Sequence, residues 1–436
     1  MKSGRVLVLL LLLIGALGSL VTSAPIYMRL LYLGSLIIIG SWLWAKLAIS
    51  GLKLTRRSRS LRANVGDIYD EYFEVDNDNR WPCPWIEVLN ETSLPAAAGS
   101  RLLVGIGRRQ KRSYLARTWL TQRGSFSLGP TTLMSGDPLG LFQISKNFPA
   151  ENEVIVLPLL VEVTSFPSPP GMLPGGKVVR RKALGVTPHA ASVREYAPGD
   201  ALRRIHWPTT VRRQQLMVKE FDQDPQAEVW IFLDAQTQVQ ASLVDEDASA
   251  RWDGWMLGKR PDFELPPSTL EYGITIAASL AHYFIRQRRA VGLVVAGQMN
   301  IAIPADRSVR QEAKILETLA FVQASRKLSL ESLVRAQAGQ LPQGSSAVLI
   351  TSSVRPEIII AIDELQRRHL HPTVILLDAA SFGGQKGSAE LAESLINANV
   401  PVCHIACEAD LGVTLSTFAK NTVYQETTKW FEPSIL

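Results

Sequence analysis

Two long apolar runs open the chain. They span Val6–Ala24 and Leu30–Ile49, and each is close to the roughly 20 residues that cross a bilayer as a helix. Trp42, Trp44 and Lys46 stand near the end of the second run, where interfacial anchors are common. Because the connection between the runs is short, the pattern predicts a transmembrane helical hairpin with both ends on one side of a membrane.

A series of short, alternating segments follows from about residue 64 to residue 163. Apolar and polar residues alternate within these segments, turn residues recur between them, and no helical period of any length is present. This pattern is typical of a β-sandwich. The segments read IYDEYFEV, WPCPWIEVLNET, RLLVGIG, YLARTWLTQ, GSFSLGPTTLM and EVIVLPLLVEV.

A third pattern begins at Glu228, after the Pro- and Gly-rich linker sequence FPSPPGMLPGG. Continuous apolar segments such as VWIFLD and VGLVVAG alternate with amphipathic helical segments such as LEYGITIAASLAHYFIRQ. This alternation predicts a doubly wound α/β domain with a parallel sheet. We therefore expect a hairpin with a basic flank at 1–62, a β-sandwich-like domain at 63–165, a linker at 166–193, and an α/β domain within 194–436 that carries an insertion at 236–268.

Charge is distributed unevenly and argues for a membrane rather than for nucleic acid. The formal net charge is +6, but residues 1–62 contain nine basic residues and no acidic ones, so the remaining chain carries −3. Nucleic-acid binding needs a broad basic face. The net negative charge of residues 63–436 does not indicate such a face. The nine basic residues are Lys2, Arg5, Arg29, Lys46, Lys53, Arg56, Arg57, Arg59 and Arg62.

The same basic residues predict the orientation of the hairpin. Most of these basic residues stand before the first apolar run or after the second one. Arg29 alone lies by the loop that connects the two runs. The positive-inside rule therefore places the N-terminus and the large C-terminal body in the cytoplasm. A cleaved signal peptide ending at Thr22-Ser23-Ala24 is the alternative, but it would leave the second span to place its basic flank outside.

The cysteines favour a reducing compartment. Cys83, Cys403 and Cys407 are too few for a disulfide framework. The sequence CHIAC brackets His404, which suggests zinc, but alternation along a strand puts this histidine on the face opposite the cysteines. We expect core packing there and no zinc site.

One arginine-rich stretch, REYAPGDALRRIHWPTTVRR (Arg194–Arg213), resembles the signature of the bacterial domain-of-unknown-function 58 family. GDPLGLF (Gly136–Phe142) is similar to an element that closes the β-region of that family. The stretch departs from the family pattern at Pro208 and Val211. Its matching residues are Arg194, Tyr196, Gly199, Asp200, Arg203, Ile205, His206, Trp207, Thr210 and Arg212.

The resemblance implies a membrane-anchored protein of the bacterial plasma membrane with a C-terminal von Willebrand factor A-like domain. Genes of this kind commonly accompany MoxR-type AAA+ ATPases, so it implies a non-enzymatic scaffold or adaptor that binds such an ATPase. On this interpretation the chain has no catalytic residues, no cofactor, no small-molecule substrate and no nucleic-acid partner. Its partners are the ATPase and the lipid bilayer.

A von Willebrand A domain often binds Mg²⁺ through an aspartate and two hydroxyl residues after its first strand, because hard cations prefer such oxygen ligands. Here Asp234 ends that strand, and Gln236 and Gln238 replace both hydroxyl residues. We expect Asp234 to cap a loop without a metal. The alternative function is a metal-dependent hydrolase that uses Asp234 at this edge of the sheet.

The signature stretch admits two interpretations. Asp200 and Arg203 form either part of a recognition loop for a partner or a structural network with Trp207 as its apolar plug, and charge clusters of this kind often serve architecture. The second interpretation is favoured. His206 has no identifiable catalytic partner, and binding of anionic lipid or nucleic acid through residues 53–62 is a third possibility.

Overall fold

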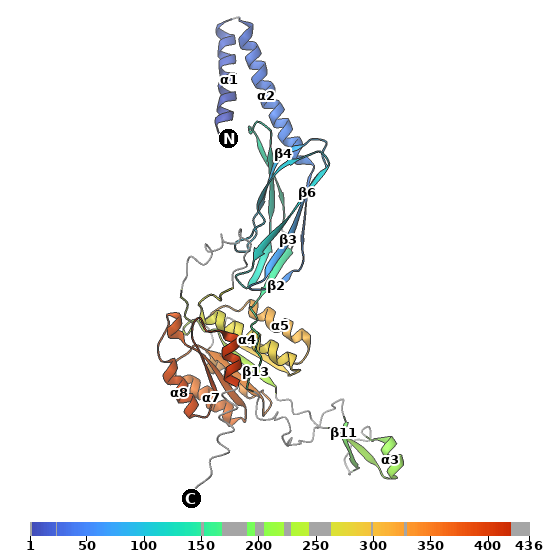
Figure 1. The fold of residues 1–436 in the computed structure, drawn as a ribbon, viewed down its shortest axis with the longest axis vertical. Helices are drawn as coiled ribbons and strands as arrows, with labels where there is room; N and C mark the ends of the chain where they lie inside the picture. The colour runs from blue at the N-terminus through green and yellow to red at the C-terminus, as the bar shows by residue number, and fades with distance from the viewer. Residues whose placement is uncertain are drawn as a thin grey trace. The chain divides into compact units, whose positions relative to one another are not determined.

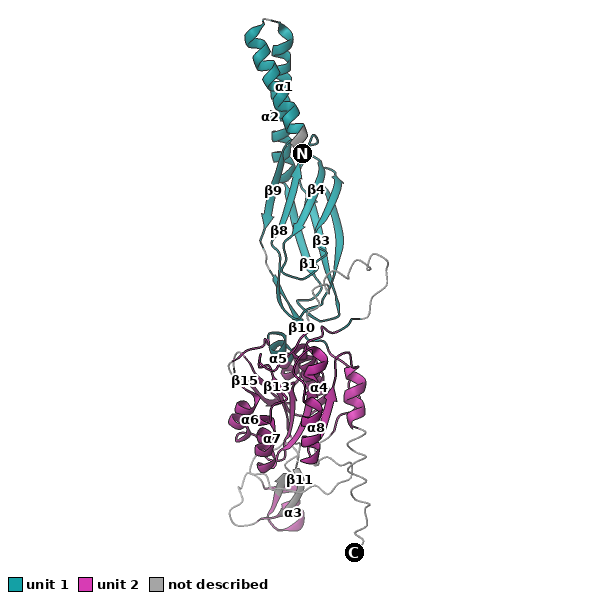
Figure 2. Ribbon diagram, turned by 90° about the vertical axis from the view of Figure 1, so that its left-hand side faces the viewer, with its two compact units in different colours: residues 1–159, 245–264, 316–321 teal, residues 160–244, 265–315, 322–436 magenta. Residues whose placement is uncertain are grey.

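The computed structural model describes residues 2–22, 24–149, 152–167, 190–196, 205–221, 228–243, 263–297, 300–326 and 329–419 (Figure 1). The chain divides into two compact units (Figure 2). Unit 1 comprises residues 1–159, 245–264 and 316–321, and unit 2 comprises residues 160–244, 265–315 and 322–436. Unit 1 contains the N-terminal helices and the β domain, and unit 2 contains the α/β sheet and the signature stretch.

The two N-terminal helices form the predicted hairpin. Helices α1 (Lys2–Val21) and α2 (Pro25–Ser50) are both long and apolar enough to span a membrane by length and composition. Glycines let them approach closely, since a Cβ added at Gly15 would lie 2.9 Å from the backbone nitrogen of Leu31. Close approach through small residues is the usual basis of helix packing in membranes.

Helix α2 continues directly into the β domain. Ala48 and Ile49 are buried in the core of that domain, and strand β1 (Leu52–Ser58) begins two residues after the helix ends. The Nδ2 atom of Asn79 donates a 2.5 Å hydrogen bond to the carbonyl oxygen of Leu47. The last turn of α2 is therefore part of the packed β domain.

Three sheets build the β domain, with strand orders β1-β3-β6, β5-β4-β8-β9 and β2-β10-β7. Side chains alternate between the two faces of each strand, and the inward ones form the core. In β3 the inward residues Phe73 and Val75 are fully buried, and the ring of Phe73 stacks on that of Tyr114 with centroids 5.1 Å apart. The predicted β-sandwich-like architecture is thus confirmed. Its further strands are β2 (Arg62–Asn64), β3 (Ile68–Asn77), β4 (Cys83–Asn90), β5 (Arg101–Ile106), β6 (Gln110–Trp119), β7 (Gly124–Leu128), β8 (Thr131–Gly136), β9 (Gln143–Phe148) and β10 (Asn152–Leu157).

Strand β1 lies inside the range that the sequence assigned to the basic flank of the hairpin. It pairs antiparallel with β3, from Leu52 opposite Asn77 to Ser58 opposite Glu71. The reason is that one of its basic residues, Arg56, turns inward and donates from Nε to Glu71 at 2.8 Å. In the sequence, an arginine that pairs inside the domain cannot be distinguished from a solvated arginine beside a membrane span.

The α/β unit contains a six-stranded sheet of order β15-β14-β13-β16-β17-β18. All neighbouring strands are parallel except the edge strand β15, which runs antiparallel to β14. The predicted doubly wound fold is confirmed, with this one antiparallel strand as a difference. The strands are β13 (Val229–Asp234), β14 (Val291–Ala296), β15 (Asn300–Asp306), β16 (Ser346–Thr351), β17 (His371–Leu377) and β18 (Val402–Ile405).

Helices cover both faces of this sheet. Helices α6 (Leu330–Ala338), α7 (Glu357–Arg367) and α8 (Ser388–Asn397) pack on the face that presents Trp230 and Phe232. Helix α4 (Thr269–Arg286) packs on the other face, where Gly273 lies against Leu233. Helix α5 (Val309–Ala320) follows β15.

Two boundaries differ from the expected ones. Strand β10 ends at Leu157, and the following residues pack on α4, where Val161 donates from its backbone nitrogen to Ser279 at 3.0 Å. Phe166, the first residue of the expected linker, is buried and lies 5.8 Å from Phe284. Strand β11 (Ala190–Glu195) begins inside the range 166–193.

Candidate functional site

The centre of the α/β sheet brings Asp234 and Thr351 together. Chain connections leave β13 and β16 toward opposite edges of the sheet, and ligands of doubly wound folds bind beyond the carboxyl ends of strands at such a point. Asp234 is the last residue of β13, and Thr351 is the last residue of β16.

Both carboxylate oxygens of Asp234 are engaged within the protein. Oδ2 accepts a 2.8 Å hydrogen bond from Oγ1 of Thr351, and Oδ1 accepts one of 3.1 Å from the backbone nitrogen of Gln236. The second bond closes the turn that follows β13, which is the loop-capping role that the sequence predicted for Asp234. The Asp234 side chain is buried, with 4% of the residue exposed.

Burial also sets the acidity of this carboxyl group. Loss of water around the charged form raises the pKa of Asp234 to about 6, against the lowering effect of the bonds from Thr351 and Gln236 and of the charge on Arg355. The neutral and charged forms of this carboxyl group are therefore closer in free energy near neutral pH than those of an exposed aspartate.

The loops on either side complete a closed network. Ser352 donates from Oγ to the carbonyl oxygen of Val239 at 2.6 Å, and Arg355 donates to Oε1 of Gln238 at 3.1 Å. Gln240 donates from Nε2 to the carbonyl oxygen of Asp234 at 2.7 Å. The bonds of Ser352 and Arg355 hold the loop after β13 against the loop after β16.

The residues at this point do not fit a divalent cation. Mg²⁺ needs several oxygen ligands with free lone pairs, whereas Asp234 is one buried carboxylate whose oxygens already accept hydrogen bonds. The Gln236 side chain donates to Gln238 at 3.3 Å. Within the described ranges no group of three or more His, Cys, Asp and Glu side chains could hold a metal.

The expected insertion at 236–268 is anchored at this same edge. An antiparallel bridge joins Ser242 to Ser268, and Leu243 donates from its backbone nitrogen to Pro267 at 3.0 Å. A Cβ added at Gly384, in the loop after β17, would lie 2.6 Å from the Cβ of Ala241. The base of the insertion therefore lies against the loop that precedes α8, while residues 244–262 fall outside the described ranges.

The loop before α8 includes Asp378, a carboxylate that the sequence analysis did not single out. Its Oδ1 accepts a 2.6 Å hydrogen bond from Oγ of Ser388, the first residue of α8. Asp378 directly follows β17 and Asp234 is the last residue of β13, and both carboxylates accept a hydrogen bond from a neighbouring element. Only the position after a buried strand could have indicated this residue in the sequence.

The signature stretch folds into a small module of two strands and a helix. Strands β11 and β12 (Met217–Phe221) pair antiparallel, and α3 (Trp207–Arg213) lies between them in sequence. Ile205, Met217 and Val218 are buried in this module. Thr210 ties the helix to the second strand, because its Oγ1 accepts a 3.0 Å bond from the backbone nitrogen of Met217.

Trp207 is not the apolar plug that the favoured interpretation required. Its side chain is 62% exposed, and Val211, one helical turn later, is 74% exposed. Residues four apart on a helix lie on the same face, so the two form one apolar patch. The short helix is fixed by Thr210 and by the buried Met217 instead, which leaves Trp207 at the surface.

The other predicted signature residues take different places. Arg194 lies on β11 opposite Val218, and Tyr196 donates from its backbone nitrogen to Leu216 at 2.8 Å. His206 Nδ1 lies 2.7 Å from Oγ1 of Thr209, which fixes the imidazole at the start of α3. Arg212 is in the last turn of α3 and exposed. Gly199, Asp200 and Arg203 lie outside the described residues.

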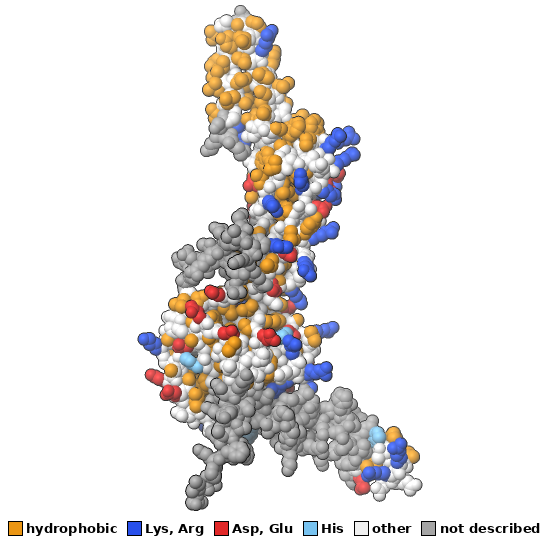
Figure 3. Space-filling model, viewed as in Figure 1, with side chains coloured by type: hydrophobic (Ala, Val, Ile, Leu, Met, Phe, Trp, Pro, Cys, Tyr) orange, Lys and Arg blue, Asp and Glu red, His pale blue; other side chains and the backbone are white. Residues whose placement is uncertain are grey.

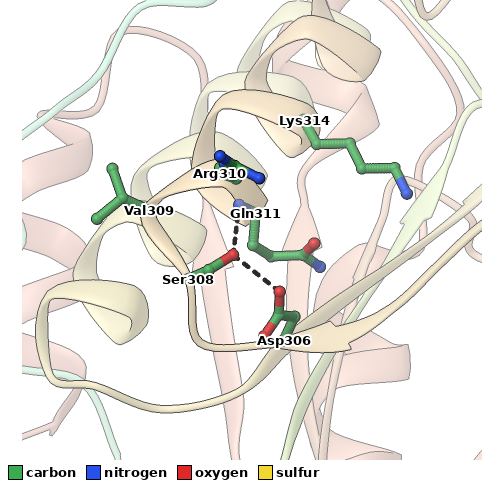
Figure 4. Close-up of a pocket in the computed structure, with 6 residues that line it drawn as sticks. All are labelled: Asp306, Ser308, Val309, Arg310, Gln311 and Lys314. Carbon is green, nitrogen blue, oxygen red and sulfur yellow. Dashed lines mark hydrogen bonds between the residues drawn. The ribbon is translucent and has the colours of Figure 1, made fainter.

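A shallow pocket of about 560 Å³ lies at the start of α5 (Figure 4). Asp306 accepts from Oγ of Ser308 at 2.8 Å, and Ser308 accepts from the backbone nitrogen of Gln311 at 3.3 Å. The bond from Ser308 lowers the pKa of Asp306, and the bond from Gln311 to Ser308 caps the helix. The polar residues Asp306 and Ser308 are therefore explained by capping of α5. Arg310 and Lys314 also line the pocket.

The CHIAC sequence follows the predicted alternation. Cys403 is buried on β18, and burial raises the pKa of its thiol to about 12, while His404 is exposed. Cys407 lies beyond the end of the strand and is half-buried. The histidine and Cys403 thus lie on opposite faces of β18.

Comparison with known proteins finds a family that is similar to one segment of this chain. Residues 192–245 match the family described as "Protein of unknown function DUF58". The uncharacterized protein YeaD of Bacillus subtilis (strain 168) is 30% identical over 154 residues, which cover 34% of this chain. The match spans only 36% of the length of that curated relative.

Solved structures show weak overall similarity. The CARDB domain of the PF1109 protein from Pyrococcus furiosus covers 24% of this chain and is itself covered to 91%, with 12% identity and a TM-score of 0.18. A GH20 exo beta-N-acetylglucosaminidase from Vibrio harveyi covers 87% of this chain and is covered to 71%, with 9% identity and a TM-score of 0.17. Neither score supports a shared fold. The resemblance predicted from the sequence is confirmed by the match of residues 192–245 to the DUF58 family.

Proposed function

We propose that the protein is a membrane-anchored, non-enzymatic scaffold that binds a partner protein through its signature module, and that this partner is an AAA+ ATPase of the MoxR type. The observation that carries the proposal is the exposed apolar patch of Trp207 and Val211 on α3. Tryptophan and arginine are the residues most enriched in the energetic centres of protein interfaces.

The surroundings of the patch support a protein partner. Arg212 and Arg213 end the same helix, so the patch has a basic edge that suits an acidic rim around an apolar pocket. The underlying strands hold the helix through His206 and Met217, whose backbone atoms share a 2.8 Å hydrogen bond. A preformed helix reduces the ordering cost of binding.

Two further features support a scaffold rather than an enzyme. Asp234 uses its carboxylate to join two loops, which is a structural task. The strand order of the sheet, with its antiparallel edge, agrees with the von Willebrand A-like domain that the family resemblance implies. Such a sheet, with its metal position replaced by internal hydrogen bonds, suits metal-independent binding of proteins.

The hairpin supports attachment to the bacterial plasma membrane. Helices α1 and α2 meet the length and composition for two spans, and the excess of basic residues at their outer ends supports a cytoplasmic location of both termini. The signature module would then meet cytoplasmic ATPases. Carbonate extraction and protease protection of membrane vesicles test this orientation.

The binding experiment uses crosslinking and affinity purification of the full chain from native membranes. Trp207→Ala combined with Val211→Ser removes the apolar patch, and we expect an ATPase that purifies with the wild type to be lost. Val413→Ser, at another exposed valine of unit 2, is the matched control and should keep the ATPase.

Stability measurements separate loss of contact from loss of fold. Thermal melting of the patch variant should match the wild type, because both side chains are exposed, whereas Met217→Ala should destabilise the module. If no ATPase purifies with the wild type, or if the patch variant retains it fully, the proposed partner or the proposed surface is wrong.

A further inference from the structure

Three loops lie together at the end of the β domain that is joined to helix α2. They are residues 78–82 between β3 and β4, residues 107–109 between β5 and β6, and residues 137–142 between β8 and β9. Asn77 joins the first two, because its Nδ2 donates to the carbonyl oxygens of Trp81 (2.9 Å) and Gly107 (3.0 Å). The pairing of Ile86 with Ser135 places the end of β8 beside the start of β4.

We propose that loop 137–142 docks on the membrane, with Leu139 in the interfacial layer of the bilayer and the arginines of the other two loops on the phosphates of anionic lipids. This inference rests on the membrane anchoring in the proposed function. It gives a task to the GDPLGLF sequence, which the adaptor role leaves unexplained.

The hairpin itself sets the level of the bilayer relative to these loops. Sixteen residues separate Arg29 from Lys46 in α2, a helical length of roughly 24 Å, close to the roughly 30 Å of the hydrocarbon core. Lys46 lies 5.0 Å from the ring of Trp42, as in an interfacial anchor. The end of α2 near Lys46 therefore marks the membrane boundary on the side of the β domain.

Two contacts hold the loops at this boundary. Arg5, at the start of α1, donates from Nε to the carbonyl oxygen of Leu141 at 2.6 Å. Trp81 packs edge-on against Trp44 of α2, with ring centroids 5.3 Å apart. Loop 137–142 thus touches one helix of the hairpin and loop 78–82 touches the other, both close to the level of Lys46.

The docking loop is braced by hydrogen bonds and presents an apolar side chain. Asp137 is buried, and its carboxylate accepts from the backbone nitrogens of Leu139 (2.9 Å) and Phe142 (2.6 Å). Gly140 has φ of +69°, a value that favours glycine. Leu139 is 62% exposed on this braced turn, which is unfavourable in water and favourable in the membrane interface.

Charge and aromatic character fit a lipid surface. Trp81 is 44% exposed, and tryptophan is enriched at the headgroup level. Arg80, Arg108 and Arg109 are exposed on the two neighbouring loops, and basic residues at this level attract anionic lipids. On the face visible in Figure 3, hydrophobic side chains cover the hairpin and Lys and Arg side chains gather on the β domain beside it.

The occupant of this surface follows from continuity with the hairpin. The loops contact α1 and α2 at the end where the spans leave the hydrocarbon core. A bilayer that contains the hairpin is therefore already next to Leu139 and Trp81. A separate protein would have to enter between the membrane and the β domain.

The test places a fluorophore on the full-length chain in lipid nanodiscs. Bimane is attached to Leu139→Cys in a Cys407→Ser background, since Cys83 and Cys403 are buried. Doxyl-labelled lipid then reports contact with the bilayer. The matched control is Ile68→Cys, an exposed apolar position at the opposite end of β3.

We expect doxyl lipid to quench the label at 139 several-fold more than the label at 68. Replacing Arg80, Arg108 and Arg109 by glutamine should reduce quenching at 139 in nanodiscs with anionic lipid and leave it unchanged in zwitterionic ones. Equal quenching at 139 and 68 overturns the docking loop, and an unchanged signal in the triple variant overturns the phosphate contacts.

Carbonate extraction of the same labelled chain distinguishes failure of the docking loop from failure of the membrane anchor. If the chain stays in the membrane but 139 is not quenched, the docking inference alone fails. If carbonate releases the chain, the membrane anchor of the proposed function fails, and the docking loop is overturned with it.

Discussion

Asp234 and Thr351 lie 117 positions apart in the chain, and a 2.8 Å hydrogen bond joins their side chains at the ends of neighbouring strands. The bond places a buried carboxylate at the carboxyl ends of two central strands of the sheet. Its consequences for stability and for metal binding can be measured separately.

Replacing Asp234 by asparagine should flatten part of the pH dependence of stability. The pKa of Asp234 is raised from 3.8 to about 6, so the folded protein binds a proton more tightly than the unfolded chain, and this contribution to stability is present below pH 4 and lost as pH rises through about 6. The difference corresponds to roughly 3 kcal/mol. Thermal denaturation from pH 4 to 8 should show wild type losing this contribution and Asp234→Asn keeping its stability. A variant that parallels wild type throughout contradicts the assignment.

Divalent cations should leave the stability of the protein unchanged. A ligand that binds the folded state raises the free energy of unfolding in proportion to the logarithm of its concentration, but the oxygens of Asp234 already accept bonds from Thr351 and Gln236. Melting with Mg²⁺, with Mn²⁺ and with a chelator checks this. A metal-dependent rise that disappears in Asp234→Ala would favour the hydrolase alternative.

Removing Arg56 should destabilise the β domain strongly. Its side chain is 16% exposed and pairs with Glu71, which is fully buried, and loss of one partner of a buried pair costs about 3–5 kcal/mol. Burial raises the pKa of Glu71 and Arg56 opposes that effect. Arg56→Ala should therefore lose more stability at pH 8 than at pH 5, where Glu71 takes up a proton more readily.

The control for this prediction lies on the same strand. Lys53 of β1 pairs with Asp78 at 2.9 Å, but both side chains are more than half exposed. Lys53→Ala should therefore leave the melting temperature unchanged. Equal effects of the two substitutions would mean that the inward pair does not support the domain.

Enlarging Gly15 should separate the two helices of the hairpin. A Cβ at this position would lie 2.9 Å from the backbone nitrogen of Leu31, whereas a Cβ at Gly40 would meet nothing within 4 Å. Gly15→Leu should lower energy transfer between fluorophores placed on α1 and α2, and Gly40→Leu should not. If both variants give the wild-type value, the close approach at Gly15 does not hold the helices together.

The elements with a strong pattern could be predicted from the sequence. VWIFLD is strand β13 and LEYGITIAASLAHYFIRQ differs from α4 by one residue at each end, because burial on both sides of a sheet or on one side of a helix leaves a regular apolar pattern. The edge strand β15, with a proline at position 304, carries less of this pattern and was not expected.

Features that depend on a distant partner could not be predicted. Arg56 reads as part of a basic flank until Glu71 is placed beside it. Trp207 reads as a core residue because tryptophan is usually well buried, and only the packing of Ile205 and Met217 shows that the module closes without it. The sequence singled out Asp234, but only the strand order places Thr351 beside it.

The way α2 ends has a mechanical consequence. Ala48 and Ile49 lie in the core of the β domain, so α2 and the domain are joined by packed side chains rather than by a linker. A force that tilts or twists the β domain is transmitted to the hairpin through Ala48 and Ile49. If the hairpin spans a bilayer as proposed, work done on the β domain would therefore reach that bilayer as a rotation of α1 and α2.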